Sequence, residues 1–226
     1  IIENKFKIHS LTIEDILSNN TRIKYEEFEN YTLIISKWIK EPTPISIETN
    51  NLSFILGQNY LITIEHQENK LISEMSKNYK KISGLIEKGG IATIVHYILD
   101  KETDRYVNLK LEYSEFFRKM EREFLHQQKI ETLKEVLAKE PILLDLRQIS
   151  ESMTDLCLDL TKPADNYINN ELIPYFRDDY DHLFKTTEGL KTMLGRINGM
   201  KNTYSSMILL NTNETMRVLT IIMALM

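Results

Sequence analysis

The spacing of apolar residues changes character near residue 68. Before that point, short runs rich in β-branched and aromatic residues predict strands at 31–38, 52–56 and 60–65. Gly57-Gln58-Asn59 separates the last two runs and predicts a hairpin turn. The first third of the chain is therefore expected to form an α/β layer whose strongest signal is its sheet.

A short helix is predicted at 10–18, ahead of the first strand. Ser10 or Thr12 is its expected N-cap, and Glu14 and Asp15 lie in the first turn, where the helix dipole favours carboxylates. Breaks in the chain are expected at three places: Asn19–Thr21, Pro42 to Pro44 and Lys162–Asn166.

After residue 68, apolar residues recur every three or four positions, which predicts helices. One helix is expected at 71–87, ended by Gly89-Gly90. A very long helix is expected from 91 to about 139, and Pro141 is expected to begin the next one. The short connection around Pro141 predicts an antiparallel helical hairpin.

The last segment begins at Pro174 and contains no further proline up to Met226. As one helix it would be about 80 Å long, at about 1.5 Å per residue. Nine uncharged residues follow Arg217. A membrane helix needs about 20 apolar residues, so we interpret these nine as the beginning of a membrane span.

These patterns predict an α+β protein in three parts. Residues 1–90 form the α/β domain, 91–162 the long helical hairpin, and 174–226 a stalk helix that enters the membrane. The chain starts without a methionine and without an apolar leader, so we expect it to begin partway into a longer protein.

Composition narrows the function classes. The chain is 42% hydrophobic and 27% charged, with a net charge of −5. An acidic balance argues against nucleic acid as a partner and is compatible with cation binding. The single cysteine, Cys157, lies between leucines and is expected to be buried. The five histidines are scattered and no catalytic or nucleotide-binding motif is present, so neither an enzyme nor an organic cofactor is expected.

Carboxylates are the first candidate binding groups. Glu14 and Asp15 lie at one helix start, and the run from Asp178 to Asp181 lies on the first turns of the last helix. Carboxylate oxygens are the ligands that hard divalent cations take. Each group could equally do no more than favour its own helix N-terminus, and the residues alone leave both interpretations open.

A stripe along the last helix is the second candidate. Its members follow one another at intervals of four and three residues, which places them on one helix face: Asn202, Ser206, Leu209, Asn213, Met216 and Thr220. The stripe is too polar for a dry coiled-coil seam. It indicates either a coiled coil whose asparagines set the register or a ring of helices around a water-filled pore.

Four segments of the chain resemble the CorA family of divalent-cation transporters, and the resemblance is collinear over essentially the whole sequence. They are Leu11-Thr-Ile-Glu-Asp-Ile-Leu-Ser-Asn, Arg22-Ile-Lys-Tyr-Glu-Glu-Phe-Glu-Asn-Tyr, Pro174-Tyr-Phe-Arg-Asp-Asp-Tyr-Asp-His and Thr212-Asn-Glu-Thr-Met-Arg-Val-Leu-Thr-Ile-Ile. The resemblance implies a homopentameric funnel around one pore in the inner membrane, with this part of the chain mostly on the cytoplasmic side. Mg2+ is the implied ion, with Co2+ or Ni2+ also carried by family members.

The resemblance also implies roles for individual residues. Asn213 matches a pore-lining asparagine, Met216 and Leu219 match a hydrophobic constriction, and Thr220 is expected to face the pore as well. Asn202 stands where the family often has an acidic residue facing the stalk axis.

The remaining implied site is regulatory. Glu14 and Asp15 match acids that meet Asp178 of a neighbouring subunit, where bound Mg2+ holds the funnel closed. The family's Gly-Met-Asn signature is absent, and Gly199-Met200-Lys201 lies too early to replace it. The sequence therefore predicts the cytoplasmic, cation-sensing part of a Mg2+ channel or transporter. A zinc transporter of the same architecture and a soluble coiled-coil interaction protein stay open as alternatives.

Overall fold

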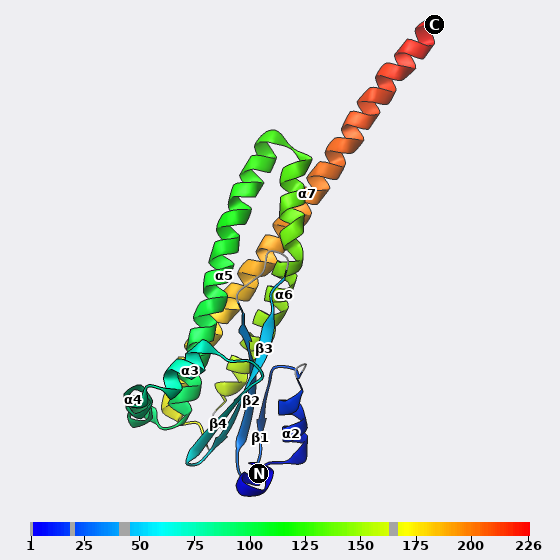
Figure 1. The fold of residues 1–226 in the computed structure, drawn as a ribbon. Helices are drawn as coiled ribbons and strands as arrows, with labels where there is room; N and C mark the ends of the chain where they lie inside the picture. The colour runs from blue at the N-terminus through cyan, green and yellow to red at the C-terminus, as the bar shows by residue number, and fades with distance from the viewer. Residues whose placement is uncertain (1, 19–20, 41–45, 163–166) are drawn as a thin grey trace.

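A four-stranded sheet and three long helices make up the molecule in the computed structural model, which describes residues 2–18, 21–40, 46–162 and 167–226 (Figure 1). The antiparallel sheet has the order β1-β2-β3-β4. Its strands are β1 (Lys24–Glu27), β2 (Thr32–Ile39), β3 (Thr49–Gly57) and β4 (Tyr60–Glu65). The predicted first strand and hairpin are confirmed, whereas the short edge strand β1 was not predicted.

The two faces of the sheet bury different residues because side chains alternate along a strand. Leu33 and Ile55 are cross-strand partners that pack on the side of α1 (Ile2–Phe6) and α2 (Ser10–Leu17). Ile34 and Phe54 are the next partners and join the large core shared with the long helices. Helices therefore cover both faces of the sheet, which separates α2 from the stalk helix.

Helix α2 confirms the predicted short helix, but its N-cap is neither Ser10 nor Thr12. The N-cap is His9, whose side chain accepts a hydrogen bond from the backbone N–H of Leu11. Thr12 is buried instead, and its hydroxyl lies 2.7 Å from the Tyr31 hydroxyl.

The single helix predicted at 71–87 is wrong, because the structure has two helices there. Helices α3 (Lys70–Ser76) and α4 (Tyr79–Gly89) are capped by the side chains of Asn69 and Asn78. An asparagine side chain satisfies the free N–H groups of a helix start, so Asn78 begins a new helix inside one apolar repeat. Gly90 follows α4 with φ of 80°, as the predicted glycine ending requires.

The long hairpin is confirmed, but its turn is not at Pro141. Helix α5 (Ala92–Gln127) ends before Gln128, which has a left-handed φ of 52°, and α6 (Ile130–Leu160) begins after Lys129. Pro141 lies inside α6. An internal proline costs about 3 kcal/mol, and burial of the following Ile142 and Leu143 offsets that cost. The left-handed turn position is held by glutamine, so no glycine or proline marks it.

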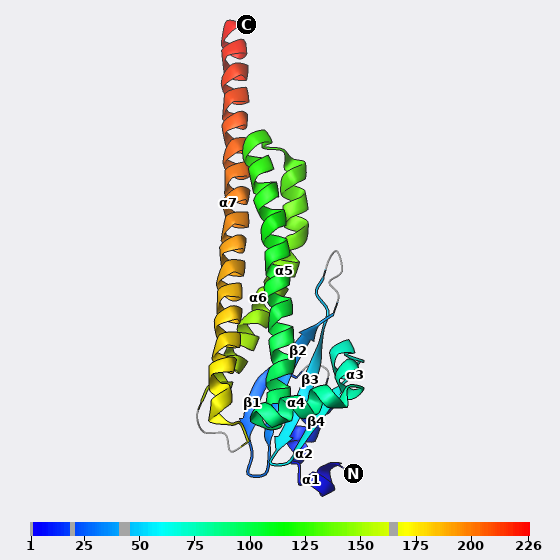
Figure 2. The same cartoon turned by 90° about the vertical axis from the view of Figure 1, so that its left-hand side faces the viewer.

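The stalk helix α7 (Ile173–Leu225) is continuous, as predicted, and is preceded by the short 3-10 helix η1 (Asn170–Leu172). Up to Met200 it buries one stripe against α5 and α6, formed by Phe176, Asp179, Leu183, Thr186, Thr187, Leu190, Met193, Leu194, Ile197 and Met200. From residue 208 onward every residue is exposed, and α7 projects beyond the end of the hairpin (Figure 2).

Three further predictions have different outcomes. Cys157 is fully buried, as expected. The predicted breaks at Asn19–Asn20, at Pro42 and Pro44, and at 163–166 lie outside the described residues. One hydrophobic core joins the sheet to α5, α6 and α7, so the proposed division of the chain near residue 90 stays a prediction.

Candidate cation sites

His96, Asp100 and Asp179 come together where α5 passes the first turns of α7. One potential ligand atom from each residue lies within 4.8 Å of the other two. His96 and Asp100 are four residues apart on α5, so they share one helix face. His96 Nε2 lies 3.5 Å from Asp179 Oδ2. The buried stripe of α7 points Asp179 at this face.

Asp179 is nearly inaccessible, with 1% of its surface exposed. Its Oδ2 atom has no hydrogen-bond partner among the described residues. Burial, joined by the negative charges of Asp100 and Asp178, raises the pKa of Asp179 to about 8. Near neutral pH the carboxyl therefore holds a proton in the ion-free protein.

His96 is the half-buried nitrogen ligand of this cluster. Its ring contacts Phe176 edge-on at 5.3 Å and Tyr175 at 5.4 Å between ring centroids. Burial lowers the pKa of His96 below its ordinary value and outweighs the opposite effect of Asp100. The imidazole is thus neutral near pH 7, the form in which histidine binds metal ions.

Asp100 is the accessible member of the cluster. Its side chain is 36% exposed and accepts a hydrogen bond from Lys101 at 3.0 Å. Lys101 also donates to Asp104 at 2.8 Å. Asp100 therefore opens the cluster to solvent while sharing one ammonium group with a second carboxylate.

The predicted acids Glu14 and Asp15 lie elsewhere, on α2. Glu14 is exposed. Asp15 is half-buried and accepts a hydrogen bond from Lys24 Nζ at 2.6 Å. Burial of Lys24 lowers its pKa, but the hydrogen bonds to Asp15 and Glu26 outweigh that effect and raise it. In the single chain, Asp15 already has a cationic partner.

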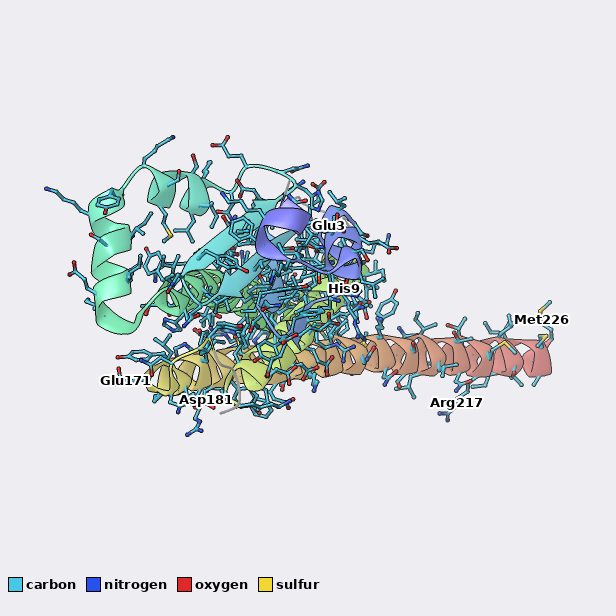
Figure 3. The ribbon with its side chains drawn as sticks, turned by 90° about the horizontal axis from the view of Figure 1, so that it is seen from below. Glu3, His9, Glu171, Asp181, Arg217 and Met226 are labelled. Carbon is cyan, nitrogen blue, oxygen red and sulfur yellow. The ribbon has the colours of Figure 1, made fainter. Side chains whose placement is uncertain are left out.

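The predicted acid Asp178 lies on the outer side of α7. Its side chain is 71% exposed, and its Oδ1 atom lies 4.0 Å from Nε2 of His182, one turn further along the helix. Figure 3 shows the neighbouring Asp181 on the α7 side of the molecule, with His9 at the start of α2 on the far side of the sheet. One chain therefore does not bring Glu14 or Asp15 to Asp178.

The predicted pore-lining residues Asn202, Asn213, Met216, Leu219 and Thr220 are all exposed. At 3.6 residues per turn, each residue turns the helix by about 100°. Asn202 follows the buried Met200 by two positions, so it faces roughly the opposite side of α7. The stripe thus points away from α5 and α6 and is free to face another molecule.

Sequence reasoning missed the cluster of His96, Asp100 and Asp179. A histidine followed four residues later by an aspartate on a helix was a usable signal, because such a pair shares a face. Asp179 belonged to the acidic run already noted at the start of α7. That these two elements meet was not visible in the sequence.

Comparison with known proteins identifies a family whose members match nearly the whole chain. The family of CorA-like Mg2+ transporter proteins matches residues 2–226. The chain belongs to this family. The match confirms the resemblance seen in the sequence, and the family's description as transporters agrees with the expectation that the chain is not an enzyme.

Relatives of the CorA family resemble the chain over nearly its full length. It is 28% identical over 218 residues to the cobalt/magnesium transport protein CorA of Thermotoga maritima, covering 96% of the chain and 62% of that relative. The chain thus spans less than two thirds of that relative's length.

Solved structures share the fold, and two of them show the extent of the likeness to the chain. The complete CorA magnesium transporter from Methanocaldococcus jannaschii superposes with a TM-score of 0.78 at 20% identity, over 97% of this chain and 69% of that one. The ZntB cytoplasmic domain from Vibrio parahaemolyticus gives a TM-score of 0.71 at 13% identity, over 94% of this chain and 82% of that one.

Within the described residues, no helix is long and apolar enough to cross a membrane.

Proposed function

We propose that this chain is the cytoplasmic, cation-sensing part of a CorA-family Mg2+ transporter or channel of the inner membrane, which also accepts Co2+ or Ni2+. Copies of the chain associate around the α7 axis as a homopentamer. Mg2+ bound between neighbouring copies by Glu14, Asp15 and Asp178 holds the assembly closed, and its loss lets the pore open. The membrane helices belong to the parent protein, and nucleic acid has no part in the function.

The position of Asp178 carries this proposal. It is an exposed carboxylate on the outer side of α7, while Glu14 and Asp15 lie beyond the opposite face of the sheet. Such acids can meet only between two copies of the chain. Their mutual repulsion would oppose that contact unless a divalent cation lay between them. At Asp15 the cation has to compete with Lys24, which makes the contact sensitive to Mg2+ concentration.

The exposed stripe on α7 supports the second half of the proposal. Asn202 and Asn213 would contact a hydrated ion along the axis of a ring of α7 helices, with Met216 and Leu219 narrowing the pore and Thr220 adding a hydroxyl. The amide at Asn202 makes a weaker cation ring than a carboxylate would. Family membership favours this interpretation of the stripe over a soluble coiled coil in which Asn213 only sets the register.

A zinc transporter is the second candidate, because the ZntB cytoplasmic domain has the same fold. At 13% identity this likeness concerns the fold alone. Flux of Mg2+, Co2+ and Zn2+ through the full-length parent protein, reconstituted in vesicles, decides between the two candidate transporters.

The sensing role is tested by Mg2+ titration of the 226-residue chain, with association followed by analytical ultracentrifugation and stability by thermal unfolding. Mg2+ should promote association and raise the melting temperature of the wild type, and Asp178→Asn should abolish both effects. Asp181→Asn, an exposed acid on the same helix, is the matched control. If Mg2+ acts equally on the wild type and on Asp178→Asn, the regulatory site is not at Asp178.

A further inference from the structure

We propose that His96, Asp100 and Asp179 form a second cation site, contained within a single chain, which prefers a first-row transition ion such as Zn2+ or Co2+ over Mg2+. The site joins α5 to the first turns of α7. It shares no residue with the inter-subunit set of Glu14, Asp15 and Asp178, and it does not rest on the function proposed above.

The distances suit one ion with little rearrangement. Two ligand atoms at about 2.0–2.2 Å from one tetrahedral ion lie about 3.4 Å apart. His96 Nε2 and Asp179 Oδ2 are already at 3.5 Å. All three ligand atoms lie within 4.8 Å of one another, so closure requires Asp100 to move by about 1–2 Å. Its partly exposed side chain has room to do so.

The buried oxygen of Asp179 is an independent indication of a ligand. Oδ2 is inaccessible and lacks a hydrogen-bond partner within the described part of the chain, although buried carboxyl oxygens are normally paired. This atom is the one that faces His96. A cation bound here would satisfy it. Among the described residues, Glu102 also has an orphaned carboxyl oxygen, but it belongs to no group of possible metal ligands there.

The surrounding charges favour a cation and leave it a path of entry. Asp104 and Asp178 add negative charge near Asp179. Lys101 is the competing cation, but it is bound to Asp104 as well as to Asp100. Asp100 can therefore exchange Lys101 for an ion while the ammonium group keeps its second partner. Water at the exposed side of Asp100 completes the coordination.

The donor set selects the class of ion. Mg2+ takes oxygen ligands in a nearly ideal octahedron, whereas imidazole nitrogen suits Zn2+, Ni2+ and related ions. One imidazole and two carboxylates form a mixed set of the kind found at Zn2+ sites. The carboxylates offset the charge of the divalent ion beside His96, whose ring contacts Tyr175 and Phe176.

Isothermal titration of the 226-residue chain with ZnCl2 or CoCl2, in a large excess of Mg2+, tests the site. The excess Mg2+ fills sites that take oxygen ligands. We expect one Zn2+ or Co2+ per chain and a change in the Co2+ absorption band on binding. His96→Gln and Asp179→Asn should each weaken binding by about tenfold or more, since even partners that only orient a ligand cost about 10–100-fold.

The matched control is His182→Gln, because His182 is an exposed histidine that also lies four residues from an aspartate. It should bind as the wild type does. Asp179→Asn keeps the shape of the side chain, so circular dichroism should confirm that the variant folds. Any one of three results would overturn the proposal. The wild type could fail to bind Zn2+ and Co2+, both site variants could bind as tightly as the wild type, or His182→Gln could lose binding.

Discussion

Glu102 allows a quantitative test of the packing between α5 and the sheet. The residue is 3% exposed and lines a cavity of about 470 Å3 together with Trp38 and Arg105. Burial raises its pKa to about 7, although Arg105 and the backbone of Ile39 act in the opposite direction. The folded protein therefore binds this proton more tightly than the unfolded chain does.

The sign of the effect on stability follows from this difference. Below pH 4.5, the ordinary pKa of a glutamate, Glu102 is protonated in both the folded and the unfolded state, so its ionisation does not lower the free energy of unfolding. As pH rises from there to about 7, the unfolded chain ionises first and the free energy of unfolding falls. The two pKa values differ by about 2.5, and at about 1.4 kcal/mol per unit the loss reaches about 3 kcal/mol.

The perturbation is Glu102→Gln, which replaces the titrating group by a neutral amide of nearly the same shape. Urea unfolding at about pH 5 and about pH 8 measures the change. Of this loss in the free energy of unfolding, about 2.5 kcal/mol falls between these two pH values. Relative to the wild type, the variant should gain this amount on going from the lower pH to the higher one.

Glu115→Gln serves as the control, because Glu115 is an exposed acid on the same helix. It should follow the wild type at both pH values. Equal pH dependence in Glu102→Gln and the wild type, or a variant that becomes less stable at about pH 8, would refute the assignment of Glu102 as a buried, destabilising carboxylate.

Two further predictions concern the long helices. Pro141→Ala should raise the melting temperature, because it restores an N–H inside α6 at an exposed position, with a gain of up to about 3 kcal/mol. Thr187→Val should cost about 1–2 kcal/mol in urea unfolding, because it removes the 2.9 Å hydrogen bond between buried hydroxyls of Thr187 and Ser150.

Each of these two predictions can be contradicted by a specific result. An unchanged or lower melting temperature for Pro141→Ala would mean that α6 depends on a bend at the proline. If Thr187→Val were as stable as the wild type, the Ser150 hydroxyl would be satisfied by other groups. Thr192→Val, at an exposed position of α7, controls for the change in helix propensity.

The elements that sequence reasoning found were those with a repeating pattern. The hairpin of β3 and β4 has apolar runs on both sides of a Gly-Gln-Asn turn, and α7 begins beside Pro174 and keeps its three-and-four spacing without interruption. Both signals are local. The α5–α6 turn was missed because Gln128 takes a left-handed conformation, which is not typical of glutamine. Pro141 was a misleading signal, because it lies inside a helix that its buried neighbours stabilise.

The exposed candidate residues were predictable because they belong to patterns on one helix. The stripe from Asn202 to Thr220 follows from spacing alone, and the structure adds only that it faces away from α5 and α6. The cluster at His96 differs, since its ligands come from two helices that lie far apart in the chain. Their meeting depends on how α7 packs along the hairpin, which no local signal describes.

Asp178 and Asp179 show the division most clearly. The sequence by itself determined that two adjacent carboxylates lie at the start of a long helix, where the dipole tolerates them. Only the tertiary structure decided which of the two side chains is buried. Successive residues of a helix point about 100° apart, so the packing of α7 on α5 buries Asp179 beside His96 and leaves Asp178 in solvent.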